Sequence, residues 1–208
     1  MESIAFFIAY VLVILFSIVL HEVAHGVAAH SLGDPTAKNL GRLTLNPIKH
    51  LDLFGSIILP VMTYWAGGFI FGYAKPVPYN PLYLNDQKYG PAKVAVAGPL
   101  TNIAIAVLFS LVLRFAPAGV FSFAAWELIA YIVFINLLLA IFNLVPIPPL
   151  DGHWILLTFL PEKYYRWKQL FQQFGIFLFV IFVLFLFPLL LPVVEFCFRL
   201  LTGSPLGG

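Results

Sequence analysis

Charged residues are scarce in this chain. Asp, Glu, Lys and Arg make up 10% of its 208 residues, whereas 62% of the residues are hydrophobic. Soluble domains carry about 25% charged residues, so an ordinary soluble domain is excluded. The net charge is only +2, and the basic residues are spread between apolar runs without forming a patch. Nucleic acid is therefore not an expected partner.

Cysteine is almost absent as well, because Cys197 is the only one. A single cysteine excludes a disulfide within the chain and a zinc site built from several thiolates. Any metal site in this sequence must use histidine and carboxylate ligands.

Long apolar runs are what the sequence has in place of charge. They cover residues 4–29, 94–113, 124–145 and 174–198. Each reaches the roughly 20 residues that a helix needs to cross a bilayer. We expect an all-α polytopic membrane protein in contact with the lipid bilayer, with about four full transmembrane helices. The first run is longer than the core of a signal peptide and has no basic residue before it, so we expect it to be retained.

Two connecting segments predict further structure. Residues 51–72 are apolar, but Gly55, Pro60, Gly67, Gly68 and Gly72 interrupt them, which is typical of a re-entrant or broken segment. Residues 43–46 alternate between apolar and polar side chains. This alternation favours a short β-hairpin at the membrane surface near residues 38–46, with a plain loop as the alternative.

The distribution of basic residues predicts the orientation in the membrane. If residues 51–72 re-enter, only Arg114 and Arg199 face the outer side. The positive-inside rule then places the others in the cytoplasm: Lys38, Arg42, Lys49, Lys75, Lys88, Lys93, Lys163, Arg166 and Lys168.

The sequence His21-Glu22-Val23-Ala24-His25 lies inside the first apolar run. On a helix, His21 and His25 are one turn apart on the same face, so both imidazoles can bind one zinc ion. In this motif the glutamate is the general base of a metalloprotease. The alternative is a pair of buried, hydrogen-bonded histidines with Glu22 as a partner. A carboxylate in an apolar helix costs about 2.5–3.5 kcal/mol, and a bound metal accounts for it better.

Zinc bound by two histidines needs a third protein ligand and an open position for water. Asp151 is the favoured candidate because it follows Asn143-Leu144-Val145-Pro146-Ile147-Pro148-Pro149-Leu150, where three prolines end an apolar run. It reaches the side of the histidines only if residues 51–72 do not cross the membrane. The other carboxylates are Asp34, Asp52, Asp86, Glu127, Glu162 and Glu195.

Taken together, HEVAH, NLVPIPPLDG and the stretch Ala97-Gly98-Pro99-Leu100-Thr101-Asn102 resemble the signature set of the site-2 protease family of intramembrane zinc metalloproteases. Residues 71–80, FGYAKPVPYN, are similar to a loop in the small bacterial branch of that family. The resemblance covers about residues 15–155. It implies His21, His25 and Asp151 as Zn²⁺ ligands and Glu22 as the catalytic base. It also implies roles near the substrate for Asn143 and Asn102. Larger members of the family carry a PDZ or CBS module that has no counterpart in these residues.

This resemblance implies a zinc metalloendopeptidase that cleaves transmembrane or membrane-anchored protein substrates, in a multi-pass cell-membrane protein whose active site faces the cytoplasm. We expect one protease domain over residues 1–208, with a catalytic core at about 4–160 and a final span at about 172–200. Asn143 and Asn102 can instead serve as interhelical hydrogen-bond partners, and Asn136 is interpreted as packing. Two other functions stay open: a membrane metal-ion carrier that uses the same His/Glu/Asp cluster, and an inactive scaffold that binds membrane helices.

Overall fold

The computed structural model describes residues 2–67, 72–117 and 119–205. These residues form an all-helical protein whose long helices are α1 (Glu2–Ser31), α4 (Gly90–Phe115) and α5 (Phe123–Asn143). A fourth long segment consists of α8 (Gly175–Ile181), a π-helical turn, a short 3-10 turn and α9 (Leu190–Thr202). The shorter helices are α2 (Thr36–Asn39), α3 (Leu59–Gly67), α6 (Gly152–Phe159) and α7 (Tyr165–Gln173).

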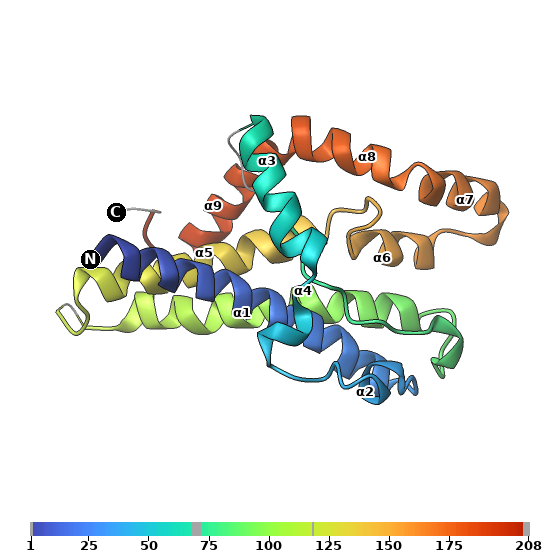
Figure 1. Ribbon diagram of the computed structural model, residues 1–208, viewed down its shortest axis with the longest axis horizontal. Coiled ribbons are helices and arrows are strands. Elements are labelled where there is room, and N and C mark those ends of the chain that lie inside the picture. Colours follow the sequence, from blue (N-terminus) through green and yellow to red (C-terminus); the bar gives the residue numbers. More distant parts are fainter. Residues whose placement is uncertain (1, 68–71, 118, 206–208) are drawn as a thin grey trace.

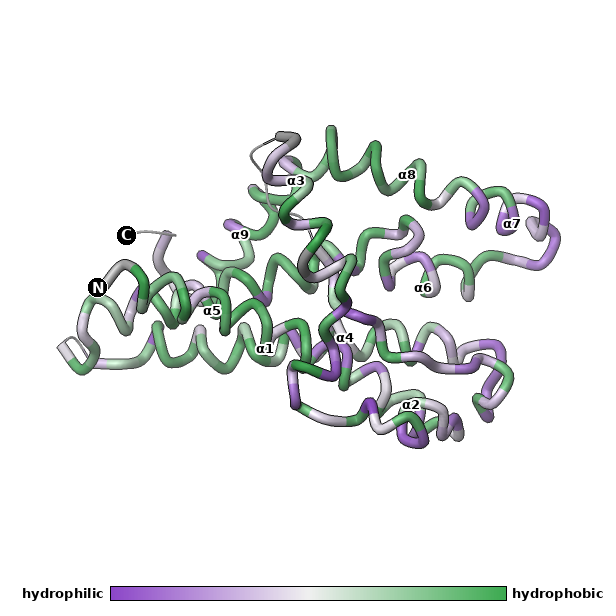
Figure 2. The backbone as a smooth tube through the Cα atoms, in the orientation of Figure 1, coloured by the Kyte–Doolittle hydropathy of each residue, from purple (hydrophilic) through white to green (hydrophobic). Residues whose placement is uncertain are grey.

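Four helical segments are long and apolar enough to cross a bilayer: Ile4–Ser31, Gly90–Phe115, Phe123–Asn143 and Gly175–Thr202. The apolar windows of these segments are only 6% to 33% buried within the protein. Such a large uncovered apolar surface is typical of helices that face lipid. Figure 2 shows apolar residues along these helices, with polar residues gathered around α2 and α7. The prediction of four transmembrane helices is confirmed.

Helix α4 lies at the centre of the fold and packs against α1, α5, α6 and α9. Figure 1 shows α1 and α4 side by side, with α5 beside them. Small residues on α4, such as Gly98, Ala106 and Ser110, are buried and let the neighbouring helices approach closely. An apolar core joins α4, α5 and α9; its buried residues are Ala106, Leu113, Val133, Leu137, Val194 and Phe198.

The predicted β-hairpin at 38–46 is wrong, because the described residues contain no strand there. Instead, α2 ends at Asn39 and the chain turns at Gly41, where φ is +63°, so that Arg42 N–H donates to Ala37 O. Asn46 then accepts from Ile48 N–H and starts a 3-10 helix at Pro47. Local turns and caps provide hydrogen-bond partners for backbone N–H and C=O groups that a neighbouring strand would otherwise have bonded.

The structure does not support the re-entrant or broken segment predicted at 51–72. Residues 54–58 form a π-helical turn that leads into α3, and residues 68–71 lie outside the described part. The two ends of the segment meet, since Tyr73 N–H donates to Gly55 O at 3.0 Å and Lys75 N–H to His50 O at 2.8 Å. The segment does not carry the chain across to the far end of α1, because Asn85 N–H donates to Leu32 O.

Candidate metal centre

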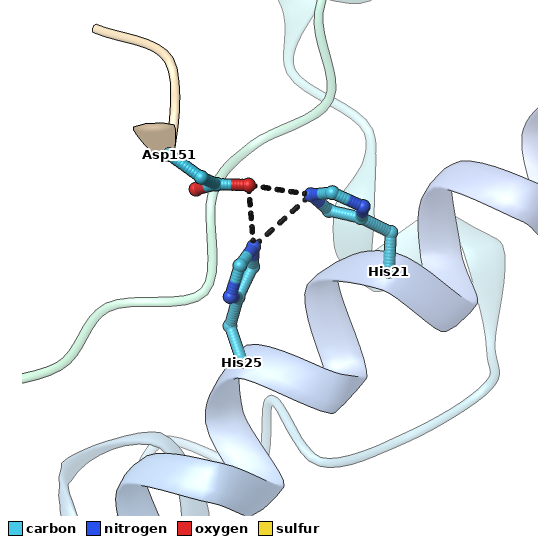
Figure 3. Close-up of side chains that lie close together, drawn as sticks. All are labelled: His21, His25 and Asp151. Atoms are coloured by element: carbon cyan, nitrogen blue, oxygen red, sulfur yellow. Dashed lines mark hydrogen bonds and ion pairs between the residues drawn. The ribbon is translucent and has the colours of Figure 1, made fainter. Parts of the chain in front are cut away.

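One helix and one turn bring three ligand-type side chains together. His21 and His25 lie on α1, and their Nε2 atoms are 3.0 Å apart. The Asp151 Oδ2 atom lies 3.1 Å from His21 Nε2 and 3.2 Å from His25 Nε2. Figure 3 shows the two imidazoles pointing from α1 toward the carboxylate. The two predicted metal motifs, 130 residues apart in sequence, therefore meet at one point.

The turn after α5 delivers Asp151. Helix α5 ends at Asn143, and the chain then folds back so tightly that a Cβ on Gly152 would lie 2.2 Å from Leu144 O. Only glycine fits at this position. Asp151 begins α6 without capping it, so its carboxylate is free to face the histidines. Burial alone would raise the pKa of Asp151, but its contacts with the two imidazoles lower it, and the carboxylate stays ionised.

The partners of the two imidazoles determine which nitrogen carries the proton. His25 Nδ1 lies 2.8 Å from Val94 O, and a carbonyl oxygen can only accept, so Nδ1 is protonated. His21 Nδ1 lies 2.5 Å from Asn102 Oδ1, which is also an acceptor. In the neutral imidazoles both Nε2 atoms then have lone pairs. Each metal-binding histidine in proteins typically donates its other N–H in this way.

With both imidazoles neutral, three acceptor atoms face one point: the two Nε2 atoms and Asp151 Oδ2. Such a set is repulsive unless a proton or a metal ion lies between them. Ligands of zinc in a tetrahedral site, at about 2.0–2.1 Å from the ion, are about 3.3 Å from one another. The separations of 3.0–3.2 Å are close to that value. Among the described residues this is the only group of three or more His, Cys, Asp or Glu side chains that could hold a metal.

Gly98 on α4 leaves space next to these ligands. A Cβ at this position would lie 2.5 Å from the Nε2 atoms of both His21 and His25. Any residue other than glycine would fill the space beside the ligand atoms. The chemistry of the donors and this space both fit a zinc ion.

A cavity of about 230 Å³ opens beside the cluster. It is lined by His21, His25 and Asp151 together with Glu22 and Asn143. Glu22 follows His21 on α1, and its Oε2 accepts a hydrogen bond from Val77 N–H at 2.8 Å. Asn143 donates to Leu139 O while facing the cavity. The structure thus brings five of the six predicted site residues to one cavity.

Asn102 is the sixth predicted residue, and its position differs from that expected of a substrate ligand. It is fully buried, it does not line the cavity, and its amide oxygen faces His21. Its contacts are with the protein, on the side of His21 away from Asp151.

Tyr79 and Trp154 also line the cavity, and the sequence analysis did not predict that they would lie there. The Tyr79 hydroxyl is buried and has no hydrogen-bond partner among the described residues. Burial and then the charge of Asp151 raise the pKa of Tyr79 to about 12, so the hydroxyl stays protonated. The FGYAKPVPYN stretch was the only sequence signal that could have pointed to it.

The other three histidines, His30, His50 and His153, do not belong to the cluster. His50 is buried and contacts Thr44 O at 2.8 Å, and His153 contacts Leu150 O. Burial lowers the pKa of His153. His50 and His153 thus have hydrogen-bond partners of their own outside the cluster.

Comparison with known proteins gives the family. The model of peptidase family M50 matches residues 9–125 and 116–187. "Putative zinc metalloprotease YwhC" of Bacillus subtilis is 38% identical over 185 residues, which cover 86% of this chain and 80% of that protein. "Putative zinc metalloprotease Rip2" of Mycolicibacterium smegmatis is 35% identical over 67% of this chain and 52% of its own length.

A third relative is archaeal. "Putative zinc metalloprotease MJ0611" of Methanocaldococcus jannaschii is 44% identical over 36% of each chain. No solved structure matches the sequence. The family match covers most of the chain, and with the four membrane helices and the His/His/Asp cluster it leads to one assignment: this multi-pass membrane protein belongs to peptidase family M50, the zinc-dependent site-2 protease family.

Proposed function

We propose that this protein is an intramembrane zinc metalloendopeptidase that hydrolyses peptide bonds within or near the transmembrane segments of membrane protein substrates. His21, His25 and Asp151 hold the zinc, Glu22 is the general base, and Asn143 binds the substrate backbone. The observation that carries the proposal is the convergence of two imidazoles and a carboxylate beside a glutamate in one cavity.

The roles of the residues follow from their positions. When bound, zinc supplies Lewis-acid chemistry, because it polarises a carbonyl group and lowers the pKa of water. Glu22 lies in the same cavity and takes a proton from the attacking water, then passes it to the leaving amine. The hydrogen bond from Val77 N–H holds the Glu22 carboxylate in place. The Asn143 amide, at the end of α5, orients the scissile peptide.

A second, larger cavity supports a membrane-embedded substrate. It has a volume of about 840 Å³ and lies between α1, α5, the α3 segment and residues 183–188. Its lining is mainly apolar, which suits the side chains of a transmembrane helix. The two cavities adjoin along the chain, since Phe142 lines the larger one and Asn143 the smaller. A substrate helix seated there presents an unwound end to Glu22.

The orientation rests on charge. Lys38, Arg42 and Lys75 lie near the end of α1 that carries the histidines, where Arg42 Nη2 donates to Lys75 O at 2.7 Å. Arg114, in contrast, donates to Leu200 O at the other end of α4. The positive-inside rule supports a catalytic cavity toward the cytoplasm.

The test compares the parent with Glu22→Gln, using purified protein and single-span test substrates. The amide keeps the shape of the carboxylate but cannot take a proton, so we expect kcat to fall by at least about 100-fold while bound zinc is retained. Glu127→Gln is the matched control, because Glu127 is a carboxylate on another apolar helix and does not line the cavity. It should leave both quantities unchanged.

The outcomes separate the candidate functions. Full activity in Glu22→Gln would overturn the proposed base. Zinc flux into vesicles by the parent, without peptide hydrolysis, would identify a metal-ion carrier instead.

A further inference from the structure

A chain of polar side chains lies behind His21, in the core between α1, α4 and α5. It consists of Ser17, Asn102 and Asn136, whose exposed fractions are 4%, 0% and 0%. Three buried polar residues in otherwise apolar helices need hydrogen-bond partners, and they find them in one another. Ser17 and Asn136 do not line the catalytic cavity.

The backbone determines the orientation of both amides. Asn136 Nδ2 donates to Ile132 O at 2.9 Å and to Ser17 Oγ at 2.9 Å, so Asn136 Oδ1 is left to accept. Asn102 Nδ2 donates to that oxygen at 2.8 Å and to Ser17 O at 3.4 Å. Because carbonyl oxygens cannot donate, neither amide can be turned over without losing these bonds.

Asn102, at one end of this row of polar side chains, contacts the proposed metal ligand His21. With its NH₂ group held by Asn136, Asn102 directs Oδ1 to His21 Nδ1 at 2.5 Å. The proton of His21 is thereby held on Nδ1, and the lone pair of Nε2 points toward His25 and Asp151. A row of hydrogen bonds thus runs from Ser17 through Asn136 and Asn102 to His21.

We propose that Asn136 and Ser17 are positioning residues for the metal site: they fix the Asn102 amide so that His21 presents an unprotonated Nε2. The inference rests on the zinc site of the proposed function and adds the residues that prepare its ligand. Without Asn136, only the 3.4 Å bond to Ser17 O holds the Asn102 NH₂ group. The amide can then turn over and donate to His21 Nδ1, which moves the imidazole proton to Nε2, where it blocks the metal.

The first test measures the affinity for Co²⁺ alone, titrated into the metal-free purified protein. Asn136→Leu should bind Co²⁺ about 10- to 100-fold more weakly than the parent, the usual effect of losing a partner behind a ligand. Asn136→Asp should restore most of the affinity. Burial favours its neutral acid, which offers a carbonyl oxygen to Asn102 and a hydroxyl to Ile132 O.

Ser17→Ala provides a milder variant with a matched control. It removes the hydroxyl that Asn136 Nδ2 bonds, and should lower the affinity by a smaller factor than Asn136→Leu. The control is Ser110→Ala, because Ser110 is also buried, lies on α4, and among the described residues donates to Val107 O on its own helix. It should leave Co²⁺ affinity unchanged.

A second readout follows the proton itself. The chain has 5 histidines, so ¹⁵N spectra of the metal-free, histidine-labelled protein can resolve each ring. In the parent, His21 should carry its proton on Nδ1, whereas Asn136→Leu should show a population with the proton on Nε2. A residue that only packs would change the melting temperature and leave this proton in place.

Parent-like Co²⁺ affinity in Asn136→Leu, with the His21 proton still on Nδ1, would overturn the proposal. If that variant does not fold, equal affinities in Ser17→Ala and Ser110→Ala would overturn it instead. Neither readout uses peptide hydrolysis. A parent that binds Co²⁺ with His21 protonated on Nδ1, yet cleaves nothing, would contradict the proposed function and leave this inference standing.

Discussion

Replacing Gly98 by alanine should separate zinc binding from stability. The new Cβ would lie 2.5 Å from His21 Nε2, 2.5 Å from His25 Nε2 and 2.6 Å from His21 Cε1. Ordinary contacts between heavy atoms are about 3.5–4.0 Å, so both imidazoles would have to move by about 1 Å. Zinc–ligand distances tolerate only about 0.2 Å, and the parent geometry cannot survive the change.

The magnitude follows from packing. An extra methyl group in a tightly packed site costs about 1–3 kcal/mol. Since about 1.4 kcal/mol corresponds to a factor of ten, zinc affinity should fall about 5- to 150-fold. Alanine in place of glycine inside a helix favours folding by up to about 1 kcal/mol. In the metal-free protein the imidazoles can turn away from the methyl group, and the helix gain offsets part of the remaining packing cost, so the melting temperature should change little.

The assay is competition for zinc against a chelator of known affinity, together with thermal unfolding of the metal-free protein. Gly90→Ala is the matched control on the same helix, because its Cβ would meet Leu84, 2.9 Å from Cδ1 and 3.1 Å from Cβ, and would lie near none of the three cluster residues. Parent-like zinc affinity in Gly98→Ala would refute the assignment of His21 and His25 as ligands through Nε2.

Two further predictions concern pH and metal removal. Asp34 is buried and accepts hydrogen bonds from Thr36 and from Asn80 N–H. Burial alone would raise its pKa, but these bonds lower it below 3.8. Its carboxylate thus stabilises the fold above that pH and stops doing so as the pH falls, so the difference in melting temperature between the parent and Asp34→Asn should shrink in acid. Removing zinc with a chelator should abolish hydrolysis and leave the helix content unchanged, because α1 holds His21 and His25 and the turn before α6 holds Asp151 without the metal. Added zinc should restore activity, and loss of helix on chelation would contradict this.

The clustering of His21, His25 and Asp151 could be predicted from the sequence because each of the two motifs is local. His21 and His25 are one helical turn apart, and Asp151 follows a proline-rich end of an apolar run, so periodicity and chain breaks indicate both motifs. The four membrane helices were predictable for a similar reason, since length and apolarity decide them.

Other features depend on tertiary contacts that no local pattern reveals. The alternation over residues 43–46 was too short to indicate a strand, and the turn at Gly41 and the cap at Asn46 took up the backbone hydrogen bonds instead. Asn136 was interpreted as packing because its partners, Asn102 and Ser17, are 34 and 119 residues away in sequence. The amide orientation of Asn102 follows only from the complete set of donors and acceptors around it.

The most direct test of the central claim is zinc K-edge X-ray absorption on the purified protein loaded with one zinc ion. The account predicts two imidazole nitrogens at about 2.0–2.1 Å with oxygen ligands at a similar distance, and one imidazole fewer in His25→Ala. A first shell in the parent with no imidazole, or a spectrum that is the same in the parent, His25→Ala and Asp151→Ala, would contradict it.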